Sequence, residues 1–281
     1  MIESLTYLGP MGTFSEQAAN LYAKSHAIND FVPMRTITEV GNYVMKNTSS
    51  SHNIQGIVPI ENSIEGSVNE TLDLLIQNED LYIQNEIVLA IEHCLITQKT
   101  TNLNEIKVIY SHPQAIGQCR NFIEKHYPNI SIMVSISTSE AVTDMKNSTL
   151  PAAAIANKKV ITHHSDCIIV QENIQDNINN ETRFIILAMN DHKPTKNDRT
   201  SICFFFDNDE PGQLFSVIKG FGDANINLVK IESRPTKTQL GEYLFLIDCN
   251  GHRLKDPLQS TLKNLGKITS KLNIFGSYPI F

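Results

Sequence analysis

The sequence has no long apolar run, and its N-terminus lacks the basic and apolar regions of a secretory signal peptide. A helix that crosses a bilayer needs about 20 consecutive apolar residues. Hydrophobic residues make up 41% and charged residues 19% of the 281 residues, which is the composition of an ordinary globular protein. We therefore expect a cytoplasmic protein without membrane contacts, large enough for about two domains.

Basic residues are also scarce, because 23 Lys and Arg face 30 Asp and Glu and leave a net charge of −7. This balance argues against a nucleic-acid partner. The five cysteines form no CxxC pair, and their odd number indicates reduced, mostly buried thiols. His163 and His164 are adjacent, so their side chains diverge, and no third ligand stands at metal spacing. We expect no metal site.

Two common nucleotide-binding motifs are missing as well. The glycine turn at residues 9–16 is not followed by Gly-Lys-Ser/Thr and does not match GxGxxG. It follows the apolar residues 5–8 and precedes a stretch with helical spacing, so it predicts a strand, a turn and a helix capped by Thr13 or Ser15. Free N–H groups at such a helix start attract anions. The turn therefore indicates an anion site more than a nucleotide site.

Two further segments place polar residues where a predicted strand ends. Residues 61–68 follow the apolar residues 56–58, and residues 111–119 follow a strand at 107–110. In open α/β sheets, ligands bind at the carboxyl ends of the strands. Three strand ends of one design predict a shared cleft, lined by Asn62, Ser111 and Gln118.

Residues 180–184 set Thr182 beside Arg183, with no catalytic His, Cys or metal cluster nearby. Arginine grips a carboxylate in two places. Threonine supplies a neutral donor whose branched side chain has few rotamers. The pair suits a substrate that carries carboxylates and needs a proton delivered to a leaving group.

Together these motifs resemble the prephenate dehydratase family. The matches, in the family's order, are GPxGTFS at 9–15, ENSxxGxV at 61–68, SHPQAxxQC at 111–119 and NxTRF at 180–184. The family's STxxAA ends in Val142 here, a small apolar change. Its regulatory ESRP stands at 232–235, and its Gly-Ala-Leu is Gly-Gln-Leu at 212–214.

The expected fold class is α/β, because strands alternate with helical patterns up to about residue 190. The resemblance implies a two-lobed catalytic domain at 1–190, similar to type II periplasmic binding proteins. We place lobe 1 at 1–79 and 167–190 and lobe 2 at 80–166, with residues 86–97 as one long strand. The polar residues 191–199 are expected to be a linker. Residues 200–281 have the βαββαβ order of a ferredoxin-like fold and resemble the ACT domain.

The resemblance implies an enzyme that converts prephenate to phenylpyruvate in L-phenylalanine biosynthesis, with no cofactor. Thr182 is the candidate catalytic residue, which either donates a proton to the leaving hydroxyl or positions one. Arg183 either binds a substrate carboxylate or ties the chain to a carboxylate such as Glu61. The chain starts at the dehydratase motif, so we expect no fused chorismate mutase domain. The candidate substrate-binding residues are Thr13, Glu61, Asn62, Ser63, Ser111, Gln118, Arg183 and Phe184.

Phenylalanine is the expected effector, bound between ACT domains that pair in a homodimer or homotetramer. Leu214 and Phe215 can accept its ring. Gln213, where the family has Ala, changes the sensitivity in a direction that the sequence leaves open. The candidate effector-binding residues are Gly212, Gln213, Leu214, Glu232, Ser233, Arg234 and Pro235.

Two alternatives stay open. Arogenate dehydratase acts on a substrate with an amine in place of the ketone, and no residue of the sequence decides between the two. A non-catalytic amino-acid sensor would share both folds. The intact NxTRF motif in a chain without an export signal favours the enzyme.

Overall fold

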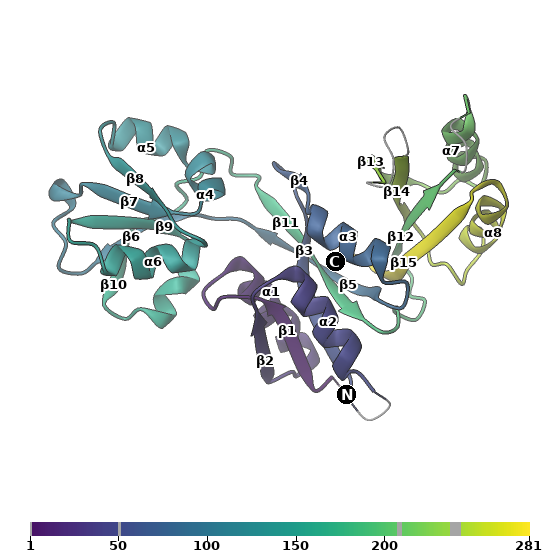
Figure 1. The fold of residues 1–281 in the computed structure, drawn as a ribbon, viewed down its shortest axis with the longest axis horizontal. Helices are drawn as coiled ribbons and strands as arrows, with labels where there is room; N and C mark the ends of the chain where they lie inside the picture. The colour runs from purple at the N-terminus through teal and green to yellow at the C-terminus, as the bar shows by residue number, and fades with distance from the viewer. Residues whose placement is uncertain (1, 50–51, 207–209, 237–242) are drawn as a thin grey trace.

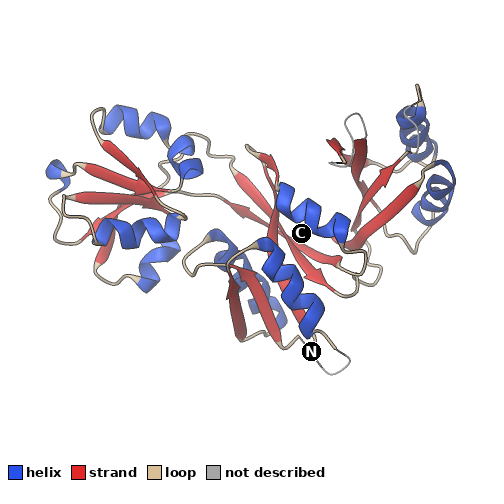
Figure 2. Ribbon diagram, in the orientation of Figure 1, coloured by secondary structure: helices blue, strands red, loops and turns tan. Residues whose placement is uncertain are grey.

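The structure is a computed structural model that describes residues 2–49, 52–206, 210–236 and 243–281. Three β-sheets follow one another along its longest axis, and helices cover their faces (Figures 1 and 2). The central sheet is lobe 1, the sheet at the left of Figure 1 is lobe 2, and the sheet at the right belongs to the C-terminal domain that was expected to be an ACT domain. Among the described helices, none has the length and hydrophobicity needed to span a membrane.

Lobe 1 has the strand order β2-β1-β3-β11-β5, with β4 paired to β3. The first three strands are parallel, and β11 runs antiparallel to both of its neighbours. Helix α1 packs on one sheet face, while α2 and α3 pack on the other. The elements are β1 (Ser4–Leu8), α1 (Phe14–His26), β2 (Asp30–Met34), α2 (Ile37–Asn47), β3 (Ile54–Asn62), β4 (Gly66–Ser67), α3 (Asn69–Gln77), β5 (Tyr82–Ala90) and β11 (Glu181–Ala188).

Lobe 2 has the strand order β10-β6-β9-β7-β8. Its central strand reads AAAIA and is buried throughout, because helices cover both faces. The elements are β6 (Cys94–Gln98), η1 (Leu103–Glu105), β7 (Val108–Ser111), α4 (Pro113–Gln118), α5 (Arg120–His126), β8 (Ser131–Val134), α6 (Thr138–Lys146), β9 (Ala152–Ala156), η2 (Lys158–His163) and β10 (Cys167–Gln171).

The strand pairing differs from the predicted lobe boundaries at both ends of lobe 2. Strand β5, predicted to open lobe 2, pairs with β11 in the sheet of lobe 1. Strand β10, predicted to belong to lobe 1, pairs with β6 in lobe 2. The run at 86–97 is therefore two strands, divided at residues 91–93 where the chain passes between the lobes. Both halves are apolar because each lies in a buried sheet, so hydrophobicity alone did not reveal the break.

The last sheet has the order β13-β14-β12-β15 with antiparallel neighbours, which confirms the ferredoxin-like arrangement. Helices α7 and α8 pack on one face of this sheet. Strand β12 begins at Asp198, inside the segment that was predicted to be a linker. The elements are β12 (Asp198–Phe205), α7 (Gln213–Asp223), β13 (Leu228–Pro235), β14 (Tyr243–Asn250), α8 (Leu258–Ile268) and β15 (Lys271–Pro279).

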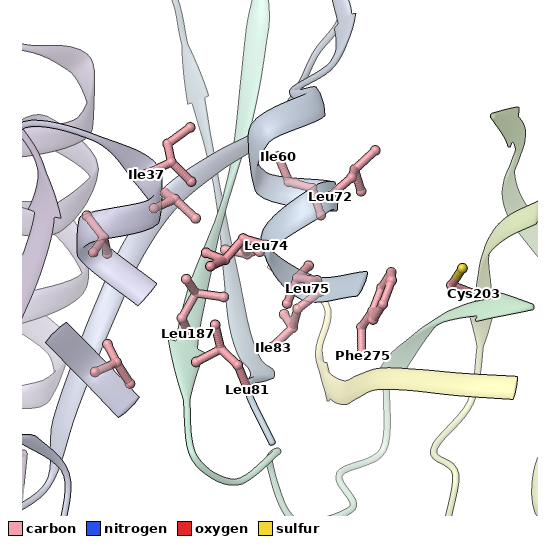
Figure 3. Packing of buried hydrophobic residues seen from close by; sticks show 14 of the residues in the cluster. Ile37, Ile60, Leu72, Leu74, Leu75, Leu81, Ile83, Leu187, Cys203 and Phe275 are labelled. Atoms are coloured by element: carbon pink, nitrogen blue, oxygen red, sulfur yellow. The ribbon is translucent and has the colours of Figure 1, made fainter. Parts of the chain in front are cut away.

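The other face of this C-terminal sheet packs on lobe 1. Cys203 and Phe275 join Leu72, Leu75 and Ile83 in one buried apolar cluster (Figure 3). The edge strand β15 also lies against the edge strand β5. The two domains therefore share a core.

Gly276 stands where β15 meets β5. Its φ of 147° is unfavourable for other residues, and a Cβ there would overlap the backbone of Ile83. We expect Gly276→Ala to lower the free energy of unfolding by about 1–3 kcal/mol, from backbone strain and lost packing. Denaturant unfolding measures the change.

Gly266→Ala is the matched control. Gly266 is exposed on α8, and an added Cβ meets nothing closer than 3.9 Å. Alanine favours a helix interior over glycine, so this variant should gain about 0.5–1 kcal/mol. A neutral Gly276→Ala would contradict the tight contact.

Candidate active site

A cleft of about 910 Å³ lies between lobe 1 and lobe 2. The segments that follow β1, β2 and β7, together with the start of α6, form its walls. The ends of β3 and β11 contribute Asn62 and Thr182, and Gln118 enters from α4. With the glycine turn at residues 9–15, the cleft thus gathers residues from all four dehydratase motifs around one space. Thr13 and Phe184, from the expected substrate-binding set, line it too.

Asn62 determines how the Thr182 hydroxyl is oriented. Its Oδ1 accepts hydrogen bonds from the backbone N–H groups of Ile64 and Glu65, each at 3.0 Å, so its amide nitrogen must face the other way. That nitrogen donates to Thr182 Oγ1 at 2.9 Å and to Asn180 Oδ1 at 2.7 Å. Among the described residues, none accepts the Thr182 hydrogen. The hydroxyl is therefore free to donate to a bound molecule.

Gln118 extends the same network. Its Oε1 accepts from Asn180 Nδ2 at 3.0 Å and lies 2.9 Å from His93 Nε2, which makes Nε2 the protonated nitrogen of the imidazole. Burial lowers the pKa of His93, against an opposing effect of the Gln118 bond, so the ring is neutral at pH 7. Gln118 Nε2 has no partner among the described residues. The sequence reading missed His93, although a histidine inside an apolar run was a usable signal.

Helices α1, α2 and α6 all begin at the cleft. Their N-cap residues Thr13, Thr36 and Ser137 each accept a hydrogen bond from the backbone N–H of a glutamate three residues later. The N-terminal end of a helix carries a partial positive charge. Three such ends around one space favour an anionic ligand.

The glycine turn of lobe 1 touches lobe 2. Ser139 donates to the carbonyl of Met11 at 2.5 Å, and Asn157 donates to the carbonyl of Gly12 at 2.6 Å. A Cβ on Gly12 would lie 2.5 Å from Ser139 Oγ, and its φ is +82°. Glycine is needed here because α6 approaches so closely. These contacts join the two lobes at one end of the cleft.

Comparison with known proteins decides the family. The prephenate dehydratase family profile matches residues 5–192, about two thirds of the chain. The chain belongs to the prephenate dehydratase family. It is therefore a lyase. The ACT domain profile matches residues 204–267, in the C-terminal sheet and its helices.

Whole-length relatives support this membership. The prephenate dehydratase of Methanocaldococcus jannaschii is 38% identical over 293 aligned positions that cover 100% of both chains. A crystal structure of the Arthrobacter aurescens prephenate dehydratase in complex with L-Phe is 30% identical with a TM-score of 0.88, covering 99% of this chain and 90% of that one. The Staphylococcus aureus enzyme is 31% identical with a TM-score of 0.82, covering 98% and 99%.

Arg183 and Glu61 were expected at the substrate, but the structure places both outside the cleft. Side chains alternate along a strand, so Arg183 points to the face opposite Thr182, toward the ACT domain. Arg183 contacts Asp248 at 2.7 Å, Glu61 at 3.0 Å and Glu86 at 3.4 Å. Of the two roles expected for Arg183, the tie to Glu61 is the one present.

Ser63 and Ser111 also lie away from the cleft wall. Ser111 is fully buried and donates to the carbonyl of Ile155 at 2.7 Å, because the last residue of β7 faces β9. Ser63 donates to the carbonyl of Asn179 at 3.2 Å and accepts from the N–H of Glu181. Both hydroxyls hold strand ends in place.

The expected effector residues divide between two faces of β13. Glu232 bonds to Ser67 at 2.5 Å and Arg234 to Asp73 at 2.9 Å, so these side chains face lobe 1. Ser233 and Pro235 are exposed on the other face. Gly212 is the exposed N-cap of α7 with φ +90°, and the next two residues, Gln213 and Leu214, are half-buried. In the described part of the chain, no group of three or more His, Cys, Asp or Glu is arranged to hold a metal ion.

The buried position of Arg183 generates a stability prediction. Arg183→Met keeps the aliphatic stem and leaves Asp248, which is 7% exposed, without its guanidinium partner. Breaking a buried ion pair from one side costs about 3–5 kcal/mol. We expect a loss of that size in the free energy of unfolding.

Arg120→Met is the control, because Arg120 pairs with Glu124 on α5 and both side chains are more than half exposed. Exposed pairs contribute about 0–1 kcal/mol. Equal losses for the two variants would disprove the special role of the Arg183 cluster.

Proposed function

We propose that this enzyme removes carbon dioxide and water from prephenate to give phenylpyruvate, as a step in L-phenylalanine biosynthesis. The observation that carries the proposal is the Thr182 hydroxyl, which Asn62 orients and whose hydrogen is free to point into the cleft. Family membership narrows the chemistry to this class of lyase.

In the proposed reaction, the bond between the ring and its carboxylate breaks and releases carbon dioxide. The electron pair enters the ring as the C–O bond at the opposite carbon breaks, and the departing hydroxyl takes one proton to leave as water. The ring becomes aromatic. Thr182 donates a hydrogen bond to the departing oxygen as negative charge develops there. A neutral hydroxyl is a weak acid in water, so this role depends on a preorganised and desolvated setting.

The rest of the cleft suits such a substrate. Phe14, Ile91 and Phe184 supply apolar surface for the ring, while Asn62 and Gln118 supply neutral polar groups. The N-terminal ends of three helices favour the carboxylates. Prephenate needs these features at the same time: a ring surface, a proton donor and anion sites.

Substitution of Thr182 tests the proposal. Thr182→Val removes the hydroxyl but keeps the shape, so kcat for prephenate should fall by about 10²–10⁴ with a small change in KM. Thr182→Ser is the matched control, since it keeps the donor and should retain most of the activity. Purified protein is assayed with prephenate and with arogenate by formation of the keto acid and of phenylalanine. A Thr182→Val variant with more than half of the wild-type kcat would refute the role of Thr182 as donor to the leaving hydroxyl. If the wild-type enzyme turned over arogenate but not prephenate, the proposed substrate would be wrong.

Phenylalanine regulation is the second part of the proposal. The related Arthrobacter enzyme was solved with L-Phe, and this chain carries the ACT domain. Among the described residues, strand β13 is an unpaired edge of the ACT sheet, and it exposes Val229 and Ile231. A bare strand edge with apolar side chains favours pairing of two chains. We infer a homodimer or homotetramer whose paired ACT domains bind the effector beside Ser233 and Gly212.

The Arg183 cluster offers a route for the signal. Asp248 lies on β14, which pairs with β13, and its other oxygen accepts from Ser201 at 2.6 Å. Arg183 follows Thr182 in sequence, and its partner Glu61 precedes Asn62. A shift of the ACT sheet would therefore act on both strands that hold the Thr182 network.

Ser233→Leu tests the effector site. The larger side chain on the exposed face of β13 should raise the inhibitory phenylalanine concentration by about tenfold or more, the effect of losing roughly 1.4 kcal/mol of binding. Activity without phenylalanine should stay near wild type. Lys263→Ala on the exposed face of α8 is the control. Wild-type activity that ignores millimolar phenylalanine would refute the regulation, and unchanged inhibition of Ser233→Leu would refute the site.

A further inference from the structure

Arg35 differs from the other arginines of this chain. The sequence has six, and five of them pair with a carboxylate: Arg120, Arg183, Arg199, Arg234 and Arg253. The guanidinium of Arg35 makes no hydrogen bond or ion pair with any described residue. Its backbone N–H is bound to the carboxylate of Glu39 at 2.9 Å, which holds the main chain at this point.

Arg35 lies on the wall of the cleft, between β2 and the N-cap of α2. Among the described residues that line this space, it is the one Lys, Arg, Asp or Glu. An unpaired cation beside a helix N-terminus adds its charge to that of the helix dipole. Arg35 is thus the one side-chain cation that the described cleft wall offers to an anion, with Glu39 bound to its backbone N–H and not to its guanidinium.

We propose that Arg35 binds the carboxylate of the three-carbon keto-acid side chain of prephenate. This inference rests on the proposed function and assigns the carboxylate grip that Arg183, enclosed behind the sheet, does not provide. Prephenate carries its hydroxyl and its two carboxylates at opposite ends of the ring. With the hydroxyl at Thr182, both carboxylates face away from the ends of β3 and β11, and the exposed Arg35 is available to them.

The charge that each carboxylate carries during the reaction indicates which one Arg35 binds. The ring carboxylate loses its charge as carbon dioxide leaves, so a cation bound to it would stabilise the substrate more than the transition state. The side-chain carboxylate keeps its charge from substrate to product. A guanidinium on that group holds the substrate without raising the barrier. Binding of this kind appears in KM and not in kcat.

The test compares Arg35→Gln and Arg35→Lys with wild type. Loss of a hydrogen bond between charged groups weakens binding by about 10–100-fold, so Arg35→Gln should raise KM for prephenate by that factor with kcat within about threefold. Arg35→Lys keeps the positive charge but loses the planar two-donor geometry of the guanidinium, so its KM should lie between the values for wild type and Arg35→Gln. Melting temperatures should not change, because the side chain has no partner among the described residues. Arg120→Gln, an exposed arginine on α5, is the control for a general charge effect.

Phenylpyruvate distinguishes the two carboxylates, because it keeps the side-chain carboxylate and lacks the ring carboxylate. Its dissociation constant, measured by calorimetry, should rise for Arg35→Gln by the same factor as KM. If KM rises and phenylpyruvate binding does not, Arg35 contacts the ring carboxylate and the assignment is wrong. Unchanged values of both would remove Arg35 from the site. Wild-type enzyme that binds phenylpyruvate but does not turn over prephenate would refute the proposed function and leave the calorimetric comparison valid.

Discussion

The ion cluster around Arg183 is the interaction on which this structure depends. One guanidinium joins carboxylates from β3, β5 and β14, and Arg199 adds a second cation at Glu86. Buried charges are tolerated only when they are paired. Moving any of these strands away would leave a buried charge without its partner, so the cluster holds the strands at fixed distances from one another. Strand β11 alternates its side chains, and the fixed position of Arg183 therefore also sets the position of Thr182 on the opposite face. The cleft hydroxyl is placed by an interaction on the other side of the sheet.

This arrangement keeps the buried carboxylates on the opposite side of the sheet from the cleft. Glu61, Glu86 and Asp248 are kept behind the sheet, while the cleft presents neutral hydroxyl and amide groups together with the guanidinium of Arg35. A chain with a net charge of −7 would otherwise repel a dianion. Helix N-termini and fixed amide dipoles attract the anion, and the glutamates in the first turns of these helices are not among the residues that line the cleft. Neutral donors that are already oriented also need little rearrangement when charge develops on a leaving group.

The sequence predicted the parts of the site that local patterns encode. Asn62, Gln118 and Thr182 line the cleft, as the motifs predicted. Asn62 ends β3 and Thr182 lies near the start of β11, and the two residues meet because β11 runs antiparallel to β3. The facing of Arg183 was not predictable, since strand parity shows two faces but not which one another domain covers. For the same reason, the sequence did not show that Glu232 faces lobe 1 while Ser233 is exposed on the other face of β13. Arg35 belongs to no motif, and only the tertiary fold brings it to the cleft.

The contact between β5 and β15 makes the ACT domain a structural part of the enzyme. Each of these strands is the last in its sheet, and each covers the other's open edge. A chain cut before β12 would expose the edge of β5 together with the apolar surface of Leu72, Leu75 and Ile83. Uncovered edges and apolar patches lead to aggregation. We therefore expect a chain cut before β12 to be less stable and more prone to aggregation than the intact chain.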